Sequence, residues 1–221
     1  NARTRAHIRQ ALVGFYDFLV DEGTRPDNPA MSLPRLRVTR GLPNPYPDGT
    51  IPLLLRGAGA LGLVHKAVIY LLSFTGLRRD EVRTLRWDQY EDVRLVRIMT
   101  KWNKERTIPL NVECIAVLAS LKARAGPAEY IFETSFRGGG RPISKSTFAR
   151  IVKDVAQLVG VEKVHPHRFR HTFATTALEQ QKDVRVVHEM LGHESLQSTQ
   201  IYTLVRPVRL EEAFRNHHYD D

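Results

Sequence analysis

The sequence contains a single cysteine, Cys114, in 221 residues. One cysteine cannot build an internal disulfide framework, and a chain so poor in cysteine is typical of a reducing compartment. Long apolar runs are also missing, since the longest, AVIYLLSF at residues 67–74, is far shorter than the about 20 residues that cross a bilayer. The chain starts without a signal-peptide pattern. We therefore expect a cytoplasmic protein with no membrane partner.

Positive charge is what the sequence has in excess. Lysine and arginine total 33 against 24 aspartate and glutamate residues, which gives a formal net charge of +9. An excess of this size indicates a polyanionic partner, although composition alone also allows a basic protein without one. The hydrophobic fraction of 42% is enough for the core of one ordinary domain with a smaller piece attached.

The first part of the chain is predicted to be the end of a domain whose start is absent. Residues 4–20 favour an amphipathic helix, which has nothing of its own to pack against. Its apolar positions are Ile8, Leu12, Phe15 and Leu19. The first residue is Asn rather than Met, which agrees with a chain that begins partway through a larger protein. We assign residues 1–32 to this domain, 33–52 to a proline-rich linker and 53–221 to a second domain.

The second domain is predicted to be mainly α with a small antiparallel β-sheet, an α+β class. The segment RLVRIMTKWNKERTIPL (94–110) alternates like two short strands joined by a polar turn, a β-hairpin. Helical spacing and caps, such as Asn111 before one helix and Ser144 before another, indicate the remaining elements. Helices are expected at residues 64–74, just after Gly76, and at 111–126, 144–158, 167–181, 184–191 and in a pair around 198–215.

One motif in this domain is misleading. GAGALG (57–62) matches G-x-G-x-x-G, and Asp80 follows at roughly the distance of a ribose-binding acid. The pattern binds a dinucleotide only inside a βαβ unit, whereas here another helix follows and no parallel strand does. We therefore interpret the segment as a loose turn between helices.

The stretch HPHRFRH (165–171) concentrates imidazoles and guanidiniums. Pro166 suits the first turn of a helix, so His167, Arg170 and His171 fall on one face at i, i+3 and i+4. A zinc site needs neutral imidazoles, an adjacent guanidinium repels the metal cation, and the sequence has no cysteine close by and no H-E-x-x-H pattern. Arginine offers phosphate oxygens a planar fork of donors, so an anion site fits better than a metal. Taken alone, the stretch also allows a solvated basic helix face.

Three other segments decide between these interpretations. They are TGLRRDE (75–81), which has a tight turn, TKWNKER (100–106), which is the expected hairpin tip, and LGHESLQSTQIYT (191–203). Each alone has an ordinary explanation, such as a surface ion pair, solvated lysines, a helix-end histidine or a core tyrosine. The residues of interest in them are Arg78, Glu81, Lys101, Lys104, His193 and, nine positions after that histidine, Tyr202.

Taken in this order, the segments resemble the tyrosine recombinase (phage integrase) family. That family is marked by an Arg in T-G-L-R-x-x-E, a hairpin Lys, an H-x-x-R box, L-G-H, and a Tyr nine residues after that His. The counterparts here are TGLRRDE, TKWNKER, HRFRHTFAT, LGH and IYT, and the resemblance covers most of residues 42–205. It implies the catalytic-domain fold of that family and, for residues 1–32, the end of its core-binding domain. One departure is Trp102, where related hairpins usually carry Gly, which leaves open whether Lys101 or Lys104 is the active lysine.

The resemblance implies DNA cleavage and rejoining without metal, ATP or another cofactor. Tyr202 would attack a scissile phosphodiester to give a 3′-phosphotyrosyl enzyme and a free 5′-hydroxyl, and the 5′-hydroxyl of a second strand would reverse the step. A phenol with a pKa of about 10 is scarcely ionised at neutral pH and needs help. Arg78 and Arg170 would clamp the phosphate oxygens, and Lys101 would protonate the leaving 5′-oxygen.

The remaining members of the implied site have supporting or undecided roles. His193 would donate a hydrogen bond to the phosphate. His167 would either orient the phosphate or accept the proton of the nucleophilic tyrosine, and the sequence does not say which. Glu81 is expected to orient Arg78, and His171 to support the site rather than to take part in the chemistry.

Double-stranded DNA at specific recombination sites is the implied partner, in the cytoplasm of a bacterial or phage-infected host cell. The family usually works as a tetramer on paired sites, here a homotetramer, and its C-terminal segment docks on a neighbour. Residues 211–221 would be that segment or else a frayed tail. Excess Lys and Arg would add non-specific, salt-dependent affinity. The candidate backbone contacts, each of which could also be plain solvated surface, are Arg79, Lys104, Arg106, Arg137, Arg141 and Lys145.

Three other functions compete with a recombinase. A type IB DNA topoisomerase shares the nucleophile and the phosphate clamp but exchanges no strands, and the LGH box nine residues before the tyrosine disfavours it. A DNA-binding regulator without catalysis is disfavoured by the full set of catalytic candidates. A metal-dependent nuclease would require a metal site, which the sequence does not indicate.

Overall fold

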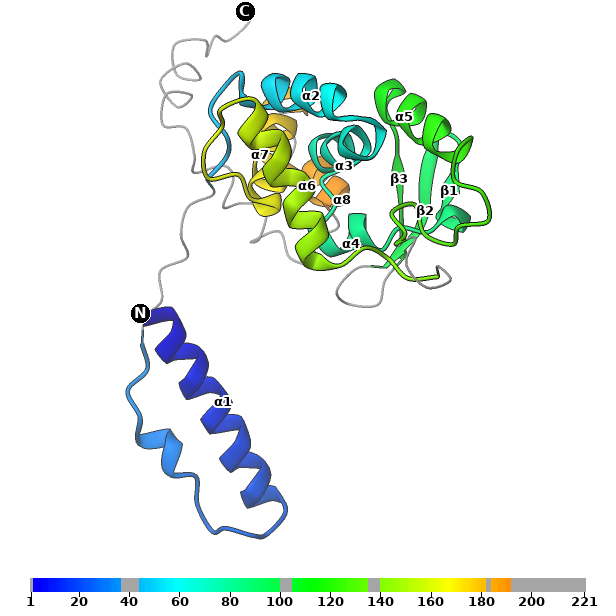
Figure 1. The fold of residues 1–221 in the computed structure, drawn as a ribbon. Helices are drawn as coiled ribbons and strands as arrows, with labels where there is room; N and C mark the ends of the chain where they lie inside the picture. The colour runs from blue at the N-terminus through cyan, green and yellow to red at the C-terminus, as the bar shows by residue number, and fades with distance from the viewer. Residues whose placement is uncertain (1, 37–43, 100–104, 135–139, 182–183, 192–221) are drawn as a thin grey trace, which may run out of the picture. The chain divides into compact units, whose positions relative to one another are not determined.

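The computed structural model describes residues 2–36, 44–99, 105–134, 140–181 and 184–191. The chain divides into two compact units, Asn1–Gly41 and Leu42–Asp221 (Figure 1). Within the described ranges no helix is both long and apolar enough to span a bilayer.

The smaller unit consists of one long helix and the segment that returns along it. Helix α1 spans Ala2–Asp21, which confirms the helix predicted at 4–20, and a short 3₁₀ helix follows at Pro29–Ser32. Asn28 fixes the return, because its side-chain amide donates to the Val13 carbonyl (3.0 Å) and to Asp17 Oδ1 (2.6 Å). The large apolar side chains of α1 remain exposed within this unit, namely Ile8, Leu12, Phe15 and Phe18.

The larger unit is built around one buried helix. Its helices are α2 (Thr50–Leu61), α3 (Leu63–Phe74), α4 (Arg79–Arg83), α5 (Val112–Lys122), α6 (Lys145–Leu158), α7 (Pro166–Gln181) and α8 (Val184–Leu191). Helix α3 contacts α2, α5, α6 and α7 and lies among them in Figure 1. It contains the apolar run AVIYLLSF, and an all-round apolar helix belongs in a core. Accordingly its Val68, Ile69 and Leu72 are fully buried.

A small antiparallel sheet lies beside the helices, in the strand order β1-β2-β3. Its strands are β1 (Tyr90–Glu91), β2 (Arg94–Met99) and β3 (Glu105–Pro109). Strands β2 and β3 confirm the predicted hairpin, whereas β1 is too short to show an alternating pattern and was not predicted. The register pairs Leu95 with Ile108 and, after an irregularity, Ile98 with Arg106. The fold class, mainly α with a small antiparallel sheet, is therefore as predicted.

The GAGALG segment is not a turn, so that prediction was wrong. Residues 57–61 form the last part of α2, and the break before α3 falls at Gly62 alone. Helix α2 packs against α6, and a Cβ placed on Gly57 would meet Val159 and, at 3.7 Å, Val155 Cγ1. This glycine lets the two helices approach closely. The element after α2 is another helix, so the segment lacks the βαβ setting of a dinucleotide site.

Gly57→Ala and Gly59→Ala form a matched pair of variants within α2. A methyl group at Gly57 collides with Val159 Cγ1, whereas at Gly59 nothing lies within 4 Å. We expect Gly59→Ala to raise the free energy of unfolding by about 0.5–1 kcal/mol, through helix propensity. Gly57→Ala should lower it by about 1–3 kcal/mol, because it overpacks the α2–α6 contact. Urea denaturation measures both, and equal effects would contradict a close helix approach at Gly57.

Candidate active site

The turn between α3 and α4 presents Arg78. Helix α3 ends before Gly76, which adopts a left-handed φ of 61°, and Thr75 Oγ1 donates to the carbonyl four residues earlier (2.6 Å). Arg78 follows in an extended conformation immediately before α4. A Cβ at Gly76 would lie 2.6 Å from the ring of Phe173 on α7. Glycine is therefore required both by the backbone conformation and by the approach of α7.

Glu81 holds both the main chain and the side chain of Arg78. Its Oε2 accepts from the Arg78 backbone N (2.7 Å), and its Oε1 accepts from Arg78 Nη1 (2.7 Å). The Glu81 side chain is 12% exposed, whereas that of Arg78 is 33% exposed. The contact expected between these residues is thus present. The Glu81 carboxylate therefore fixes both the backbone position of Arg78 and the orientation of its guanidinium.

Arg170 on α7 is buried, at 6% exposure, and joins three parts of the fold. Its Nη1 donates to the Gly76 carbonyl in the α3–α4 turn, and its Nη2 donates to the Leu191 carbonyl at the end of α8 (2.7 Å). The last carbonyls of a helix have no partner within the helix, so an arginine is well suited to this place. The structure therefore brings Arg170 to the turn that carries Arg78, as a shared phosphate site requires.

Arg106 on β3 contacts Glu81 and α8 as well. The sequence indicated Arg106 only as a candidate DNA-backbone contact, not as a neighbour of Glu81. Its Nη2 lies 3.1 Å from Glu81 Oε2, and its Nη1 donates to the Met190 carbonyl (3.3 Å). Its side chain is only 10% exposed. Burial lowers the pKa of Arg106, the Glu81 carboxylate opposes that shift, and the charge of Arg78 adds to it. The available signal was strand alternation, because Arg106 and the buried Ile108 are two residues apart and share a face.

Tyr46 clamps the start of α7. Its hydroxyl accepts from the His165 backbone N (3.0 Å) and donates to the His165 carbonyl (3.2 Å), while its own backbone N donates to Thr172 Oγ1 (2.8 Å). The Arg168 guanidinium lies 4.3 Å from the centre of the Tyr46 ring. Burial raises the pKa of Tyr46 to about 12, so the phenol stays protonated. The last part of the predicted linker, residues 44–52, is therefore packed within the larger unit. Tyr46 contacts the start of α7, and α2 already begins at Thr50.

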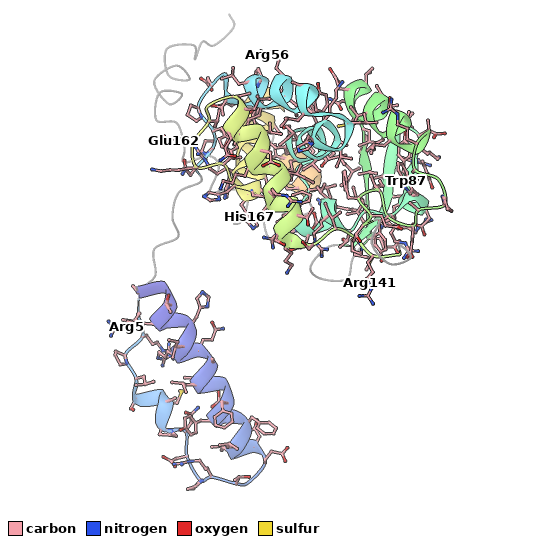
Figure 2. All side chains as sticks on the ribbon, viewed as in Figure 1. Arg5, Arg56, Trp87, Arg141, Glu162 and His167 are labelled. Carbon is pink, nitrogen blue, oxygen red and sulfur yellow. The ribbon has the colours of Figure 1, made fainter. Side chains whose placement is uncertain are left out.

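The two histidines of the H-x-x-R helix lie in different surroundings. His167, labelled in Figure 2, is exposed near the start of α7, and His171 one turn later is partly buried. Burial lowers the pKa of His171, and the neighbouring His167 and Arg170 lower it further. His171 is therefore mainly neutral at neutral pH, whereas His167 lies at the surface beside the buried Arg170.

A second group of cations surrounds Asp80 on α4. Asp80 accepts from Arg79 (3.0 Å) and Arg83 (3.1 Å), and Lys145 Nζ lies 4.0 Å from its carboxylate. Burial alone would raise the pKa of Asp80, but the hydrogen bonds from Arg79 and Arg83 outweigh it and lower the pKa. Of the predicted DNA contacts, Arg79 and Lys145 therefore lie together, and Arg141 is separately exposed (Figure 2).

Several predicted site residues lie outside the described ranges. They are Lys101, Lys104, Arg137, His193 and Tyr202. Their roles remain predictions from the sequence. Across the described residues, no group of three or more His, Cys, Asp or Glu side chains is arranged to hold a metal ion.

The chain is similar in sequence and in structure to known DNA recombinases. The model of the phage integrase family matches residues 52–208. Tyrosine recombinase XerD of Listeria monocytogenes is 30% identical over 231 residues, which is 99% of this chain and 77% of that protein. Tyrosine recombinase XerC of Chromobacterium violaceum is 35% identical over 228 residues, with 99% and 75% covered. The crystal structure of the XerH site-specific recombinase bound to difH substrate superposes with a TM-score of 0.73 at 22% identity, over 96% of this chain and 64% of that one.

The lowered pKa of His171 predicts a pH-dependent stability. Below its ordinary pKa of 6.5 the unfolded chain binds a proton that the folded chain does not, so acidification favours unfolding. The free energy of unfolding should fall as pH decreases through 6.5, with this residue contributing at most about 1.4 kcal/mol per pH unit. Denaturation of wild type and His171→Gln across that range measures the difference. His7→Gln, in an exposed position on α1, is the control, and identical slopes in wild type and His171→Gln would contradict the prediction.

Proposed function

The chain belongs to the phage integrase family and is a tyrosine-type site-specific DNA recombinase, and from this premise we propose that it cuts and rejoins DNA through a 3′-phosphotyrosyl intermediate. Tyr202 is the nucleophile of this proposal. Arg78 and Arg170 are the phosphate clamp, His193 and His167 assist at the phosphate, and Lys101 is the general acid, with Lys104 as the other candidate. The reaction needs neither metal nor ATP.

The observation that carries this proposal is the convergence of Arg78 and Arg170 on one turn. Arg170 on α7 donates to the carbonyl of Gly76, two residues before Arg78, although the two arginines are far apart in the sequence. Both guanidiniums are partly or fully withdrawn from water, where attraction to an anion is stronger than in bulk solvent. The phosphorane-like transition state carries extra negative charge on its non-bridging oxygens. Fixed cations at that position stabilise the transition state more than the ground state.

The proposed cleavage step balances without an energy source. The Tyr202 oxygen forms a bond to the scissile phosphorus as its proton passes to a base, for which His167 is the candidate, and the bond to the 5′-oxygen breaks as Lys101 supplies a proton to it. In the second step a 5′-hydroxyl attacks the phosphotyrosine and the tyrosine leaves. Each step exchanges one phosphodiester bond for another, so the energy of the bond is conserved.

We further propose how the chain meets its DNA. Arg79 and Lys145 beside Asp80, together with the exposed Arg141, would contact the DNA backbone, with Lys104 and Arg137 as further candidates. Residues 1–32 would be the end of a core-binding domain, 33–52 the connection to the catalytic domain at 53–221, and residues 211–221 a segment that docks on a neighbour in a homotetramer on paired sites. The reaction would take place in the cytoplasm.

Covalent catalysis by Tyr202 is the first prediction of this proposal. A nicked suicide substrate from the element or genome that encodes the chain should give a protein–DNA adduct on a denaturing gel, in the presence of a chelator. Tyr202→Phe should abolish the adduct, because phenylalanine has no nucleophile. A wild-type adduct that requires metal, or one that persists in Tyr202→Phe, would contradict the proposal. Plasmid relaxation without recombinants from paired sites would favour a topoisomerase instead.

The phosphate clamp gives a second prediction. Arg78→Ala and Arg170→Ala should each slow cleavage by about 10²–10³-fold or more, because each removes a donor to the developing charge, while DNA binding is largely retained. Only Arg170→Ala should also lower the free energy of unfolding, by about 1–3 kcal/mol, because buried carbonyls of Gly76 and Leu191 lose their donor. Single-turnover cleavage and thermal unfolding separate these effects. Near wild-type cleavage by either variant would rule out the clamp.

A further inference from the structure

We infer that Arg106 is a positioning residue of the recombinase site, which acts on the phosphate through Glu81 and Arg78 rather than by touching DNA. The inference rests on the proposed function. It also replaces, for this residue, the DNA-backbone contact expected from the sequence. Four observations support it. They are the direction of the Arg106 side chain, the Glu81 carboxylate that it shares with Arg78, its contact with α8, and the energetics of its burial.

The strand directs Arg106 away from the solvent. Residues of β3 alternate between the two faces of the sheet, and Arg106 lies in phase with the buried Ile108 and opposite the buried Ile98. Its neighbours Glu105 and Thr107 point to the exposed face. Only 10% of the Arg106 side chain is exposed, and its two Nη atoms are bound to Glu81 and to the Met190 carbonyl.

The carboxylate of Glu81 is divided between two guanidiniums. Oε1 accepts from Arg78 Nη1, while Oε2 is occupied by the Arg78 backbone N and by Arg106 Nη2. Arg106 therefore disfavours a bidentate pair between Glu81 and the Arg78 guanidinium. Such a pair would turn more of the Arg78 donors away from the phosphate. One negative charge between two positive charges also leaves the cluster cationic. Without Arg106, Glu81 would largely cancel the charge of Arg78.

Arg106 also holds the end of α8. It donates to the Met190 carbonyl, and Arg170 donates to the next carbonyl, that of Leu191. These are the last residues of the helix, whose carbonyls lack partners within it. His193 follows only two residues later in the sequence. Arg106 thus ties β3 to the C-terminal end of α8.

Stability alone does not explain why an arginine occupies this position. Burial lowers the pKa of the guanidinium, and the Nε atom is buried with no hydrogen-bond partner among the described residues. Replacing a whole buried ion pair with apolar residues is often neutral for stability, because the desolvation penalty disappears, so a buried arginine is weak evidence of a purely structural role. Loss of Arg106 alone would leave Glu81 paired with Arg78. The charge of Arg106 is therefore better explained by the electrostatics of the site.

The test compares Arg106→Met with Arg94→Met in the full-length protein. Arg94 on β2 is the matched control, since it pairs with Glu91 at 2.8 Å but is 56% exposed. We expect Arg106→Met to slow single-turnover cleavage by about 10- to 100-fold, the effect of displacing a reacting group by about 1 Å, with DNA affinity retained. Arg94→Met should cleave like the wild type. The dependence of affinity on salt should be the same in all three proteins.

A substrate with a neutral methylphosphonate at the scissile position gives the decisive readout. If Arg106 acts through the charge of Arg78, the defect of Arg106→Met should shrink to a few-fold on this substrate, whereas a folding defect would slow both substrates equally. Arg106→Lys keeps a cation opposite Glu81 and should restore part of the rate. If Arg106→Met does not fold, Arg106→Lys takes its place as the test variant. A folded Arg106→Lys that restores nothing on the ionic substrate would overturn the electrostatic role.

Other outcomes are equally distinct. Wild-type cleavage by Arg106→Met overturns the inference alone. So does a salt-dependence slope reduced by about 0.9, which would mean a direct phosphate contact. No covalent adduct from the wild-type protein would instead remove the proposed function, and this inference with it.

Discussion

The pairing of one nearly buried carboxylate with two guanidiniums is the interaction on which the rest of the site depends. Glu81 fixes the backbone and side chain of Arg78 and shares its second oxygen with Arg106. A carboxylate inside an anion site would normally weaken it by repulsion. Here the negative charge is outnumbered, so it orients the cations without neutralising them. The cluster therefore combines fixed geometry with a remaining positive charge, which are the two properties that a phosphate clamp needs.

Arg170 and Arg106 connect parts of the fold that are distant in the sequence. Arg170 joins the α3–α4 turn to the end of α8, and Arg106 joins β3 to the same end. Backbone carbonyls left without donors at these places would add negative potential beside the proposed phosphate position. Arg170 and Arg106 donate to them and also hold α7, α8, β3 and the α3–α4 turn together. The buried helix α3 provides the rigid base from which the turn carrying Arg78 emerges.

Local patterns in the sequence were enough to predict most of the elements and part of the site. The periodicity of the helices, the Ser144 cap and the alternation of residues 94–110 each depend on neighbouring residues, and the same is true of Arg78 and Glu81, which are one helical turn apart. The partners of Arg106 and Tyr46 are distant in the sequence, so no local pattern predicts these contacts. GAGALG was misjudged for a related reason, because Gly57 serves the packing of α2 on α6, which is distant in the sequence, and the break between helices falls at Gly62 alone.

Tyr46 has a mechanical consequence. It is fastened to His165 and Thr172 by hydrogen bonds from both its hydroxyl and its backbone N, and Arg168 donates to the carbonyls of residues 44 and 45 beside it. The chain from the smaller unit reaches these contacts before it reaches α2. A pull along that chain would therefore reach the N-terminal half of α7, where His167 and Arg170 lie, together with the core cluster to which Tyr46 belongs. The start of the larger unit is thus tied to α7, the helix that carries His167 and Arg170.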